Sequence, residues 1–503
     1  MPRIFGKTIG KKTAAFLLIV EALFFSLIVV ILILRQNHYV SLSGPRPNVV
    51  IFLVDSLRAD HLGCYGHDVP TSPFLDKLAK RGVLFEFARS QSSWTMPSVA
   101  SLFTSLYSSE HKLISSREES DYLHIYNYGF LREELTTLAE VFRENGYLTA
   151  AFITNDYIAS VFNFRQGFDE FFMLSRSMPP ENGKQVRILD LPANFVHDKL
   201  RAFLQDYKPS YSDRLLAKVG VYKKPFFIYV HYMDVHYPYY PPPPFTDIFD
   251  RLYVNRPDTI LTAEQIDGMR FSFKDVNRIN FYLSRYDGQI RFFDHELKNL
   301  LNWIEESGVL SPAIMAFTAD HGEAFNEHNK FNHGGKPYEG VIHVPLIIWG
   351  TPDFPKGKRV SESVEIIDIA PTLLEASGIT APDQFEGLNL IGTINNRKTS
   401  QRLRWSENYS ENEPSLIMID GRRKWIFNLA GDYMSEVYDL KEDSHEKLNL
   451  IDTIVAETTR KQAKRMRDWH KRMGIKIKFK KKVIRPDIPD DIKRKLKALG
   501  YLE

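Results

Sequence analysis

The chain has 503 residues, of which 65 are basic and 62 acidic, so its formal net charge is only +3. Hydrophobic residues make up 44% and charged residues 25%, a globular composition that excludes a mainly disordered chain. The single cysteine, Cys64, excludes an internal disulfide, a cysteine-based zinc cluster and an iron–sulfur site. The nearly balanced charge gives no support for nucleic-acid binding by the chain as a whole.

The first segment with a distinct composition is residues 13–34, an apolar run of 22 residues with one charged side chain, Glu21. A helix needs about 20 apolar residues to cross a bilayer, so this run is predicted to be a transmembrane anchor. Segment 1–12 carries four basic residues, which predicts a cytoplasmic N-terminus and an extracytoplasmic location for the rest of the chain. The alternative is a cleaved signal peptide, whose apolar core is usually about 7–15 residues long. The longer run favours an uncleaved anchor and a single-pass membrane protein.

A polar linker over 35–46 leads into residues 47–398, where apolar runs alternate with helix-like segments. These runs are unbroken rather than alternating, which is typical of strands buried on both faces. Alternation of such strands with helices predicts an α/β fold around a mostly parallel sheet flanked by helices. The longest expected helix extends from about 262 to 306. The expected strands lie at 48–54, 148–154, 226–232, 313–319 and 344–350.

The pattern changes beyond residue 398. Residues 399–450 contain short alternating runs separated by Gly, Asp and Asn, which predict a small C-terminal antiparallel sheet as a subdomain. Residues 451–503 are predicted to form a basic helical tail, since 461–503 holds 16 Lys and Arg against 5 Asp and Glu. A tail of this kind is usually a solvated surface, and contact with anionic lipid is the alternative.

Polar side chains stand at the ends of three expected strands. Asp55 follows the first strand, His231 and Asp234 lie at the end of the third, and Asp320 and His321 follow the fourth. Ligands of parallel sheets bind beyond the carboxyl ends of the strands, so these side chains are expected to meet. One aspartate in such a position is explained by capping of the next helix, but three polar strand ends together indicate a site.

Two further segments carry residues suited to chemistry. Thr95 precedes Met-Pro-Ser at the start of an expected helix, where the simplest role of its side chain is to cap that helix. At a positive helix end beside a metal, the same hydroxyl would be activated for attack. Residues 320–336 concentrate His, Glu, Asp and Lys beyond what a surface loop needs, and His231 and His236 flank an aspartate in a way that favours a substrate role.

These segments resemble motifs of the sulfatase family, within the alkaline-phosphatase-like superfamily. NVVIFLVDSLRADHLGCYG resembles the opening metal motif, TMPSVASLFTS the nucleophile motif, and FTADHGEAFNEHNKFNHGGKPYEG the second metal segment. The similarity extends to the closing KALGYLE, so it covers nearly the whole chain beyond residue 46. It implies an alkaline-phosphatase/sulfatase-like sheet for 47–398.

The resemblance also implies a cofactor, one divalent metal ion, which is Ca, Zn, Mn or Mg. The ligands that it implies are Asp55, Thr95, Asp320 and His321. An imidazole ligand disfavours an ion that binds only oxygen. Thr95 would in addition be the nucleophile.

Roles toward the substrate follow from the same resemblance. The residues expected to contact the transferred anionic group or to protonate the leaving oxygen are Lys336, His236 and His333. Further substrate-binding candidates are His231, Arg58 and His328, of which the arginine also suits a structural role.

Two departures from the family pattern bear on the chemistry. Sulfatases oxidise a Cys or Ser in a Cys/Ser-x-Pro-Ser/Ala-Arg motif to formylglycine, whereas this chain has Thr95 there and Val99 in place of the arginine. Because threonine carries a methyl group on Cβ, this oxidation cannot give an aldehyde. The related phosphoethanolamine and phosphoglycerol transferases use a threonine nucleophile. The second departure, Ser56 where many sulfatases have another Asp, makes the metal site less anionic.

The sequence therefore predicts a membrane-anchored, metal-dependent enzyme that cleaves or transfers a phosphoester group of the phosphoethanolamine or phosphoglycerol type through a covalent Thr95 intermediate. The expected partners of this enzyme are the lipid bilayer and an anionic ester on a lipid or glycan. The sequence does not predict its oligomeric state. One alternative is a sulfuric ester hydrolase that does not use formylglycine. Another is a catalytically silent binding or scaffold protein, against which the retained metal and nucleophile residues argue.

Overall fold

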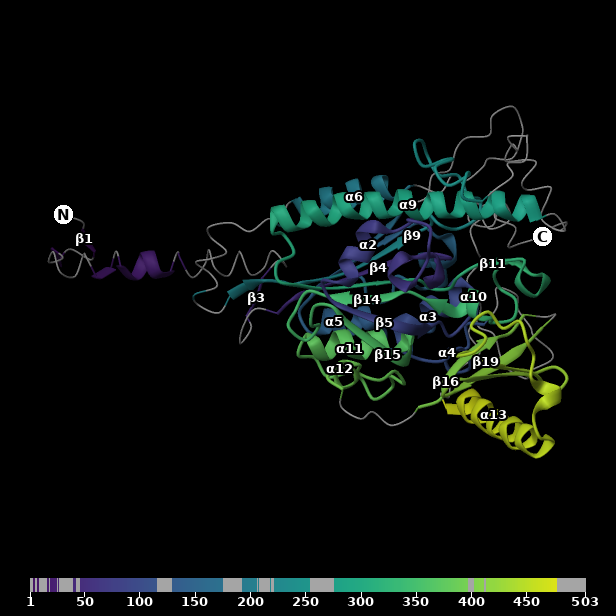
Figure 1. Cartoon of the computed structure of the whole chain (residues 1–503). Helices are drawn as coiled ribbons and strands as arrows, with labels where there is room; N and C mark the ends of the chain where they lie inside the picture. The colour runs from purple at the N-terminus through teal and green to yellow at the C-terminus, as the bar shows by residue number, and fades with distance from the viewer. Residues whose placement is uncertain are drawn as a thin grey trace, which may run out of the picture.

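The computed structural model describes residues 46–114, 129–174, 192–205, 221–253, 276–396, 402–410 and 413–476, with positions 207 and 218 and short pieces of the first 41 residues. Its centre is a nine-stranded sheet in the order β13-β5-β14-β10-β4-β9-β6-β7, with β15 paired to β5 (Figure 1). The strands are β4 (Asn48–Val54), β5 (Val83–Arg89), β6 (Leu148–Ile153), β7 (Glu170–Met173), β9 (Phe226–Tyr232), β10 (Ala313–Thr318), β13 (His343–Val344), β14 (Leu346–Trp349) and β15 (Lys358–Glu365).

Strands β10, β4, β9, β6 and β7 are neighbours and run parallel, which confirms the prediction of a mostly parallel sheet. Every residue of β4 and β9 is buried, as expected from their unbroken apolar sequences. The strand expected at 344–350 differs, because β14 runs antiparallel to both β10 and β5. The sheet is therefore mixed, and its parallel half contains the strands that end in polar residues.

Helices cover both faces of this sheet (Figure 1). On one face lie α2 (Pro73–Ala79), α6 (Ala193–Gln205) and α9 (Val276–Ser307). On the other lie α3 (Thr95–Thr104), α5 (Leu138–Glu144) and α11 (Ile369–Ala376). The first part of the long helix expected from residue 262 lies outside the described residues, which resume at Val276.

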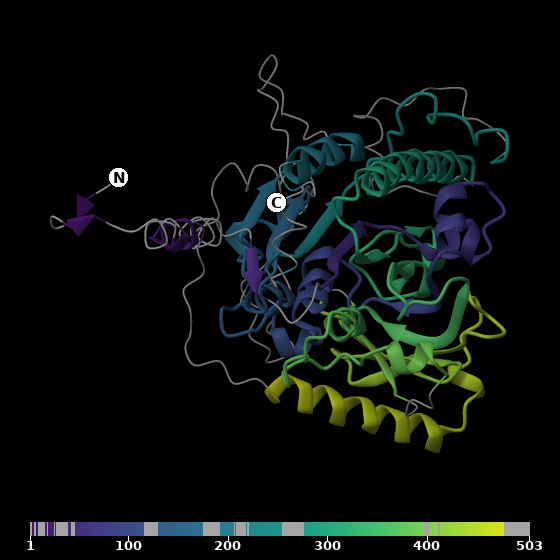
Figure 2. The ribbon, with the colours of Figure 1, turned by 90° about the vertical axis from the view of Figure 1, so that its left-hand side faces the viewer.

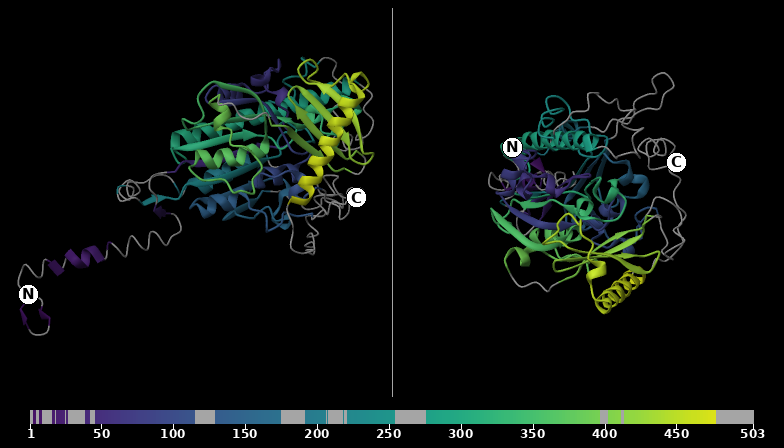
Figure 3. Two further views of the ribbon diagram at one scale, coloured as in Figure 1. Left: turned by 90° about the horizontal axis from the view of Figure 1, so that it is seen from below. Right: turned by 45° about the vertical axis from the view of Figure 1, so that its right-hand side comes forward.

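A four-stranded antiparallel sheet follows, in the chain order β16 (Arg404–Asn408), β17 (Ser415–Asp420), β18 (Arg423–Asn428) and β19 (Tyr433–Asp439). It confirms the predicted antiparallel sheet, although β17, an unbroken apolar run, was not among the expected strands. The helix α13 (Ala456–Lys476) lies across this sheet (Figures 2 and 3), where Trp469 stacks on Trp405 at 4.1 Å between ring centroids. The rest of the predicted basic tail, 477–503, lies outside the described residues.

The prediction of a transmembrane anchor over 13–34 is wrong. No helix in the described part of the chain has enough consecutive apolar residues to cross a membrane. Within this segment the structure describes helical residues at 16–17, 19–24 and 26, and the other positions lie outside the described residues. The predicted transmembrane helix is therefore removed from the fold class. The predicted localisation as a single-pass membrane protein with an extracytoplasmic domain is withdrawn for the same reason.

Candidate active site and metal centre

The site lies where neighbouring parallel strands end. Asp55 follows β4, His231 is near the end of β9, Asn155 lies two residues beyond β6, and Asp320 lies two residues beyond β10. The strands β10, β4, β9 and β6 are adjacent in that order, so their carboxyl ends place these four side chains at one edge of the sheet.

Thr95 is the first residue of α3, and its side chain is nearly completely buried in this cluster. The hydroxyl donates a hydrogen bond to Asp55 Oδ2 at 3.3 Å, and Oγ1 lies 3.3 Å from His321 Nε2. The amide of Asn155 is 3.5 Å from the same oxygen. As the start of a 10-residue helix, this position also lies at the positive end of the helix dipole, which favours negative charge on the oxygen.

The ring orientation of His321 is that of a metal ligand. Its Nδ1 is 2.8 Å from the carbonyl oxygen of Gly322, so this nitrogen carries the proton and donates it. The lone pair is then on Nε2, which lies 3.4 Å from Asp55 Oδ1 and 3.5 Å from Asp320 Oδ2. An imidazole nitrogen with its lone pair directed at two carboxylates needs a cation between them.

The donor set of Asp55, Asp320 and His321 fits a divalent ion. One potential ligand atom from each lies within 4.8 Å of the others, and all three residues are buried. Asp320 Oδ2 accepts no hydrogen bond from the described residues, a costly arrangement for a buried carboxylate unless a cation compensates. Two carboxylate oxygens and one imidazole nitrogen suit a hard or borderline ion, and Thr95 Oγ1 offers a third oxygen as a fourth donor atom.

The two carboxylates differ in their electrostatics. Burial alone would raise the pKa of Asp55, but the hydrogen bond from His231 and the neighbouring His236 and His321 hold this pKa well below its usual range. For Asp320, burial and then the charge of Asp55 raise the pKa well above its usual range. Asp55 is thus the more firmly ionised partner, and a bound cation would relieve the repulsion between the pair.

Two backbone features shape the cluster. A Cβ on Gly322 would lie 2.3 Å from the carbonyl oxygen of Gly340, so only glycine permits this close approach after Asp320 and His321. Ser56 has φ of 60°, in the left-handed region, which places its hydroxyl 3.1 Å from Asp55 Oδ1 and its amide 3.4 Å from Asp320 Oδ1. Both carboxylates are therefore held by the segment that follows β4.

His231 is fully buried behind Asp55. Its Nε2 lies 3.2 Å from Asp55 Oδ2, and its Nδ1 is 2.8 Å from the hydroxyl of Tyr229. This placement suits a residue that orients the carboxylate of Asp55; the role of His231 in substrate binding stays a prediction.

His333 and His236 line the same region. The His333 ring lies 4.4 Å from the His321 ring and 5.1 Å from the His236 ring, measured between centroids. His333 Nδ1 is 3.2 Å from Glu323 Oε1, while the hydroxyl of Tyr239 donates to Oε2 at 3.0 Å. Burial lowers the pKa of His236 despite the nearby charge of Asp55, which favours the neutral imidazole. The roles of His236 and His333 toward the substrate stay predictions.

Three other predicted site residues, Lys336, Arg58 and His328, contact groups other than Thr95 and its neighbours. The ammonium group of Lys336 pairs with Glu436 of the C-terminal sheet at 2.7 Å. Arg58 is buried in ion pairs with Asp60 at 2.8 Å and Glu327 at 2.7 Å. His328 stacks on a tyrosine, with ring centroids 3.6 Å apart, and lines with Arg58 a small pocket next to the C-terminal sheet. The roles of all three toward substrate stay predictions.

Two residues of the site were missed by sequence reasoning. Asn155 donates to Asp55 Oδ2 at 2.7 Å, and its signal was its place just after a buried strand, like that of Asp55. Glu323 is fully buried beside His333, and burial raises its pKa to about 7. The sequence shows that Glu323 lies two residues after His321, but it does not reveal that the side chain points toward the histidines.

Comparisons with known proteins identify the family of this chain. Residues 47–379 match the family described as Sulfatase, and residues 327–472 match the family described as N-sulphoglucosamine sulphohydrolase, C-terminal. The arylsulfatase of Clostridium perfringens is 26% identical over 463 residues, which cover 81% of this chain and 91% of that protein. Human iduronate 2-sulfatase is 24% identical over 409 residues, which cover 67% of this chain and 70% of that protein.

Solved structures share the fold. One is described as a complex with its substrate D-glucosamine-2-N,6-O-disulfate; it has a TM-score of 0.65 and 20% identity, with 85% of this chain and 97% of that chain covered. Another is a phosphonate monoester hydrolase from Silicibacter pomeroyi, with a TM-score of 0.63 and 18% identity, which covers 85% of this chain and 96% of that one. Because the first family match covers more than half of the sequence, the chain belongs to the sulfatase family, as an enzyme acting on sulfate or phosphate esters.

Proposed function

We propose that this enzyme cleaves a phosphoester bond through a covalent intermediate on Thr95, with a divalent metal ion held by Asp55, Asp320 and His321. The observation that carries the proposal is the position of Thr95 Oγ1, 3.3 Å from both Asp55 Oδ2 and His321 Nε2 at the start of α3. An alcohol in this position is a nucleophile and a metal ligand without further modification.

The identity of the residue favours phosphorus chemistry. A threonine cannot be oxidised to the formylglycine that sulfatases use, so the side chain must react as an alcohol. Attack of an alkoxide on phosphorus is a common enzymatic step that gives a stable phosphoester. The presence of phosphonate monoester hydrolases among the structural neighbours supports this fold as a framework for reactions at phosphorus.

The metal ion, when bound, supplies positive charge that favours the alkoxide of Thr95 and the negative charge that develops on the transferred group. Asn155 orients Asp55 through its 2.7 Å hydrogen bond, and His231 does the same from the other side at 3.2 Å. The hydrogen bond from His321 Nδ1 to Gly322 keeps the lone pair of Nε2 directed into the site. These contacts hold the attacking oxygen in place before substrate arrives.

The reaction also requires a proton transfer, for which His236 and His333 are available. Thr95 Oγ1 forms a bond to phosphorus while the bond from phosphorus to the leaving oxygen breaks. The proton lost by the Thr95 hydroxyl equals the proton that the leaving oxygen gains. We assign its transfer to His236 and His333, the latter oriented by Glu323. In the second half of the reaction, water or an acceptor hydroxyl attacks the phosphothreonine and restores Thr95.

A second candidate is hydrolysis of sulfate esters by the same threonine. It is favoured by the names of the relatives, which include an arylsulfatase and an iduronate 2-sulfatase. The donor group stays a prediction as well, with phosphoethanolamine and phosphoglycerol esters as the first candidates and a lipid or glycan hydroxyl as the acceptor.

The test is the mass of the Thr95 peptide after acid quenching of the enzyme during turnover. An aryl phosphate, a phosphonate monoester and an aryl sulfate serve as substrates, and kcat/KM is measured for each. We expect a phosphoryl adduct on Thr95, whose mass from a natural donor identifies the transferred group. A higher kcat/KM for the sulfate than for both phosphorus substrates would move the assignment to the second candidate. Unchanged turnover in Thr95→Ala would refute both.

A further inference from the structure

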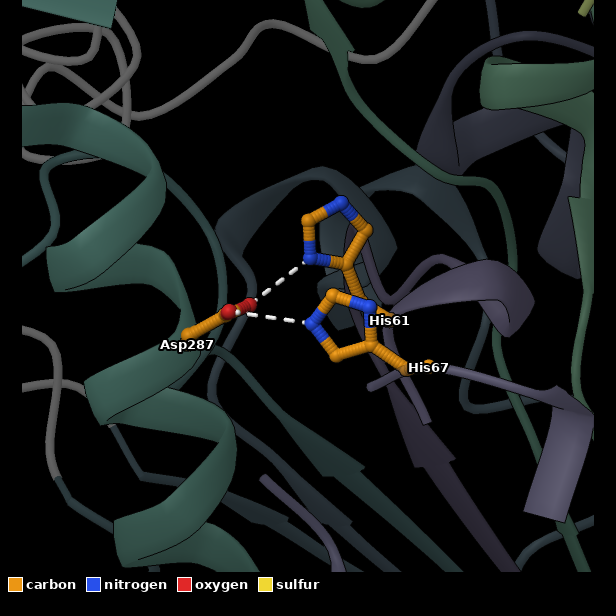
Figure 4. Close-up of side chains that lie close together, drawn as sticks. All are labelled: His61, His67 and Asp287. Atoms are coloured by element: carbon orange, nitrogen blue, oxygen red, sulfur yellow. Dashed lines mark hydrogen bonds and ion pairs between the residues drawn. The ribbon is translucent and has the colours of Figure 1, made fainter. Parts of the chain in front are cut away.

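A second group of potential metal ligands lies outside the Thr95 site, between the segment after β4 and α9. It consists of His61, His67 and Asp287, and we call it the His61–Asp287 cluster (Figure 4). His61 ends a short 3-10 helix (Ala59–His61), His67 follows a second one (Gly63–Tyr65), and Asp287 lies on α9. One potential ligand atom from each residue lies within 4.8 Å of the others.

Both imidazoles point at the carboxylate (Figure 4). His61 Nδ1 lies 2.7 Å from Asp287 Oδ1, and His67 Nε2 lies 3.1 Å from Oδ2. The ring centroids of the two histidines are 4.7 Å apart, so the rings face the carboxylate side by side. The hydroxyl of Tyr253 donates to Asp287 Oδ2 and so helps to hold the carboxylate in place.

The cluster is closed to solvent. The side chain of Asp287 is 0% exposed, that of His61 9% and that of His67 16%. Within the described part of the chain, the recorded ion-pair partners of Asp287 are these two imidazoles, and the nearby guanidinium of Arg58 pairs with Asp60 and Glu327 instead. A buried carboxylate thus faces two imidazole nitrogens, without a lysine or arginine paired to it among the described residues.

We propose that the His61–Asp287 cluster binds a second divalent cation of the zinc class, through two imidazole nitrogens and the carboxylate. Zinc takes nitrogen and oxygen ligands at about 2.0–2.2 Å in a tetrahedron, so neighbouring donor atoms are roughly 3.4 Å apart. The present separations of 2.7 and 3.1 Å need only a small outward movement of the imidazoles. His67 follows Gly66, whose φ of 103° marks a turn at which the loop can adjust.

The cluster is largely buried and lies outside the Thr95 site, so we assign this metal a structural function. Here it would join the segment 59–67 to α9. The residue next to Asp287, Tyr286, already holds the residues just before this segment, because its hydroxyl donates to the Ser56 carbonyl at 2.7 Å and accepts from the Arg58 amide at 2.9 Å. A metal in the cluster would therefore stabilise the chain directly after Asp55, while the Thr95 site keeps its own ion.

The experiment counts ions per chain by elemental analysis after the purified full-length protein is loaded with zinc and desalted. The wild-type protein is expected to hold two equivalents, and His67→Ala and Asp287→Asn one each. Asp320→Asn should lose the equivalent of the Thr95 site and keep the one in the cluster, and Asp320→Asn with His67→Ala should hold none. The control His295→Ala changes a half-exposed histidine on the same helix and should leave two equivalents.

A second measurement does not depend on variants of the cluster being folded. X-ray absorption at the zinc edge of Asp320→Asn should show two imidazole ligands, because the Thr95 site offers only His321 among its proposed ligands. Retention of the second equivalent in both His67→Ala and Asp287→Asn would overturn the proposal. So would a wild-type protein that saturates at one equivalent, lost in Asp320→Asn. Neither outcome bears on the role of Thr95, which is tested by its adduct.

Discussion

Thr95 Oγ1 lies 3.3 Å from His321 Nε2, although 226 residues separate the two in the chain. They meet because α3 begins at the edge of the sheet where β10 ends. His321 is fixed by its hydrogen bond to Gly322, and Thr95 is fixed as the first residue of a buried helix. The oxygen that we propose as the nucleophile and the nitrogen that we propose as a metal ligand are therefore held by rigid elements, which is an arrangement that covalent catalysis requires.

Replacement of Thr95 tests the nucleophile directly. Thr95→Ala removes the only atom that can form the covalent bond, so kcat/KM should fall by about 10³-fold or more. Thr95→Ser keeps a hydroxyl and should retain measurable turnover and the peptide adduct. Steady-state kinetics with an aryl phosphate measure both effects. The matched control is Ser93→Ala, which removes a buried hydroxyl two residues away that has no hydrogen-bond partner among the described residues.

Asp320→Asn should weaken binding of the catalytic metal. The change keeps the shape of the side chain but removes one of two negative charges next to His321, so metal content should fall well below that of the wild-type protein and turnover should fall with it. Elemental analysis and kcat measure the two effects. Asp294→Asn is the control, because Asp294 is also buried but accepts hydrogen bonds from the amides of Phe74 and Leu75 instead. Unchanged metal content in Asp320→Asn would contradict the ligand assignment.

The meeting of Asp55, Asp320 and His321 at one edge of the sheet could be predicted because the positions of buried strands follow from simple patterns. Unbroken apolar runs marked the buried parallel strands, and polar residues at their ends marked Asp55, Asp320 and His321. Asn155 follows the same rule, but a single asparagine after a strand is also the usual start of a turn, so the pattern alone did not select it. The antiparallel direction of β14 depends on its partners β10 and β5, which no local pattern reveals.

Other features depended on distant contacts. Lys336 is only 15 residues from His321, yet its ammonium group turns to Glu436, which is 100 residues further along in the C-terminal sheet. Hydropathy counting over 13–34 measured composition alone, and no helix among the described residues is long and apolar enough to cross a membrane. Likewise His61 and His67 carried no signal of their own, because Asp287 reaches them from a helix more than 200 residues away.

The ionisation of Asp234 should make the free energy of unfolding depend on pH. Burial raises the pKa of this carboxyl to about 7, while Oδ1 accepts the amide of Ala193 at 2.8 Å and Oδ2 has no hydrogen-bond partner among the described residues. Since the pKa is higher in the folded state, its stabilising contribution is complete below about pH 4 and is lost as the pH rises through 7. Asp234→Asn keeps the acceptor for Ala193 without the ionisation.

The free energy of unfolding of the wild-type protein should therefore fall relative to Asp234→Asn between about pH 4 and pH 7, by about 1.4 kcal/mol for each unit of pKa difference. Urea unfolding of both proteins at constant metal concentration measures the difference, and effects shared by the two proteins cancel. A difference that stays constant over this range would contradict a raised pKa.

Packing of α13 on the C-terminal sheet should depend on Trp469. Its ring is 5% exposed and stacks on Trp405 at 4.1 Å, within a cluster that also contains Met466. Trp469→Ala leaves a cavity there and should lower the free energy of unfolding by about 3–5 kcal/mol. Urea unfolding followed by far-ultraviolet circular dichroism measures it. Lys471→Ala, an exposed change on the same helix, should have little effect, and equal midpoints for the two variants would contradict the described packing.

Variants of Asn155 test the orientation of Asp55 independently of metal binding. Its amide donates to Asp55 Oδ2 at 2.7 Å and lies 3.5 Å from Thr95 Oγ1, but it is not among the proposed ligands. Asn155→Ala should lower kcat by roughly 10- to 100-fold and leave metal content near that of the wild-type protein, since second-sphere partners act on orientation. Asn155→Asp places a carboxylate against Asp55, so repulsion should cost more activity than the alanine change. Asn145→Ala, which removes an amide at the end of α5, is the control. Equal activity in Asn155→Ala and the wild-type protein would show that His231 alone suffices to orient Asp55.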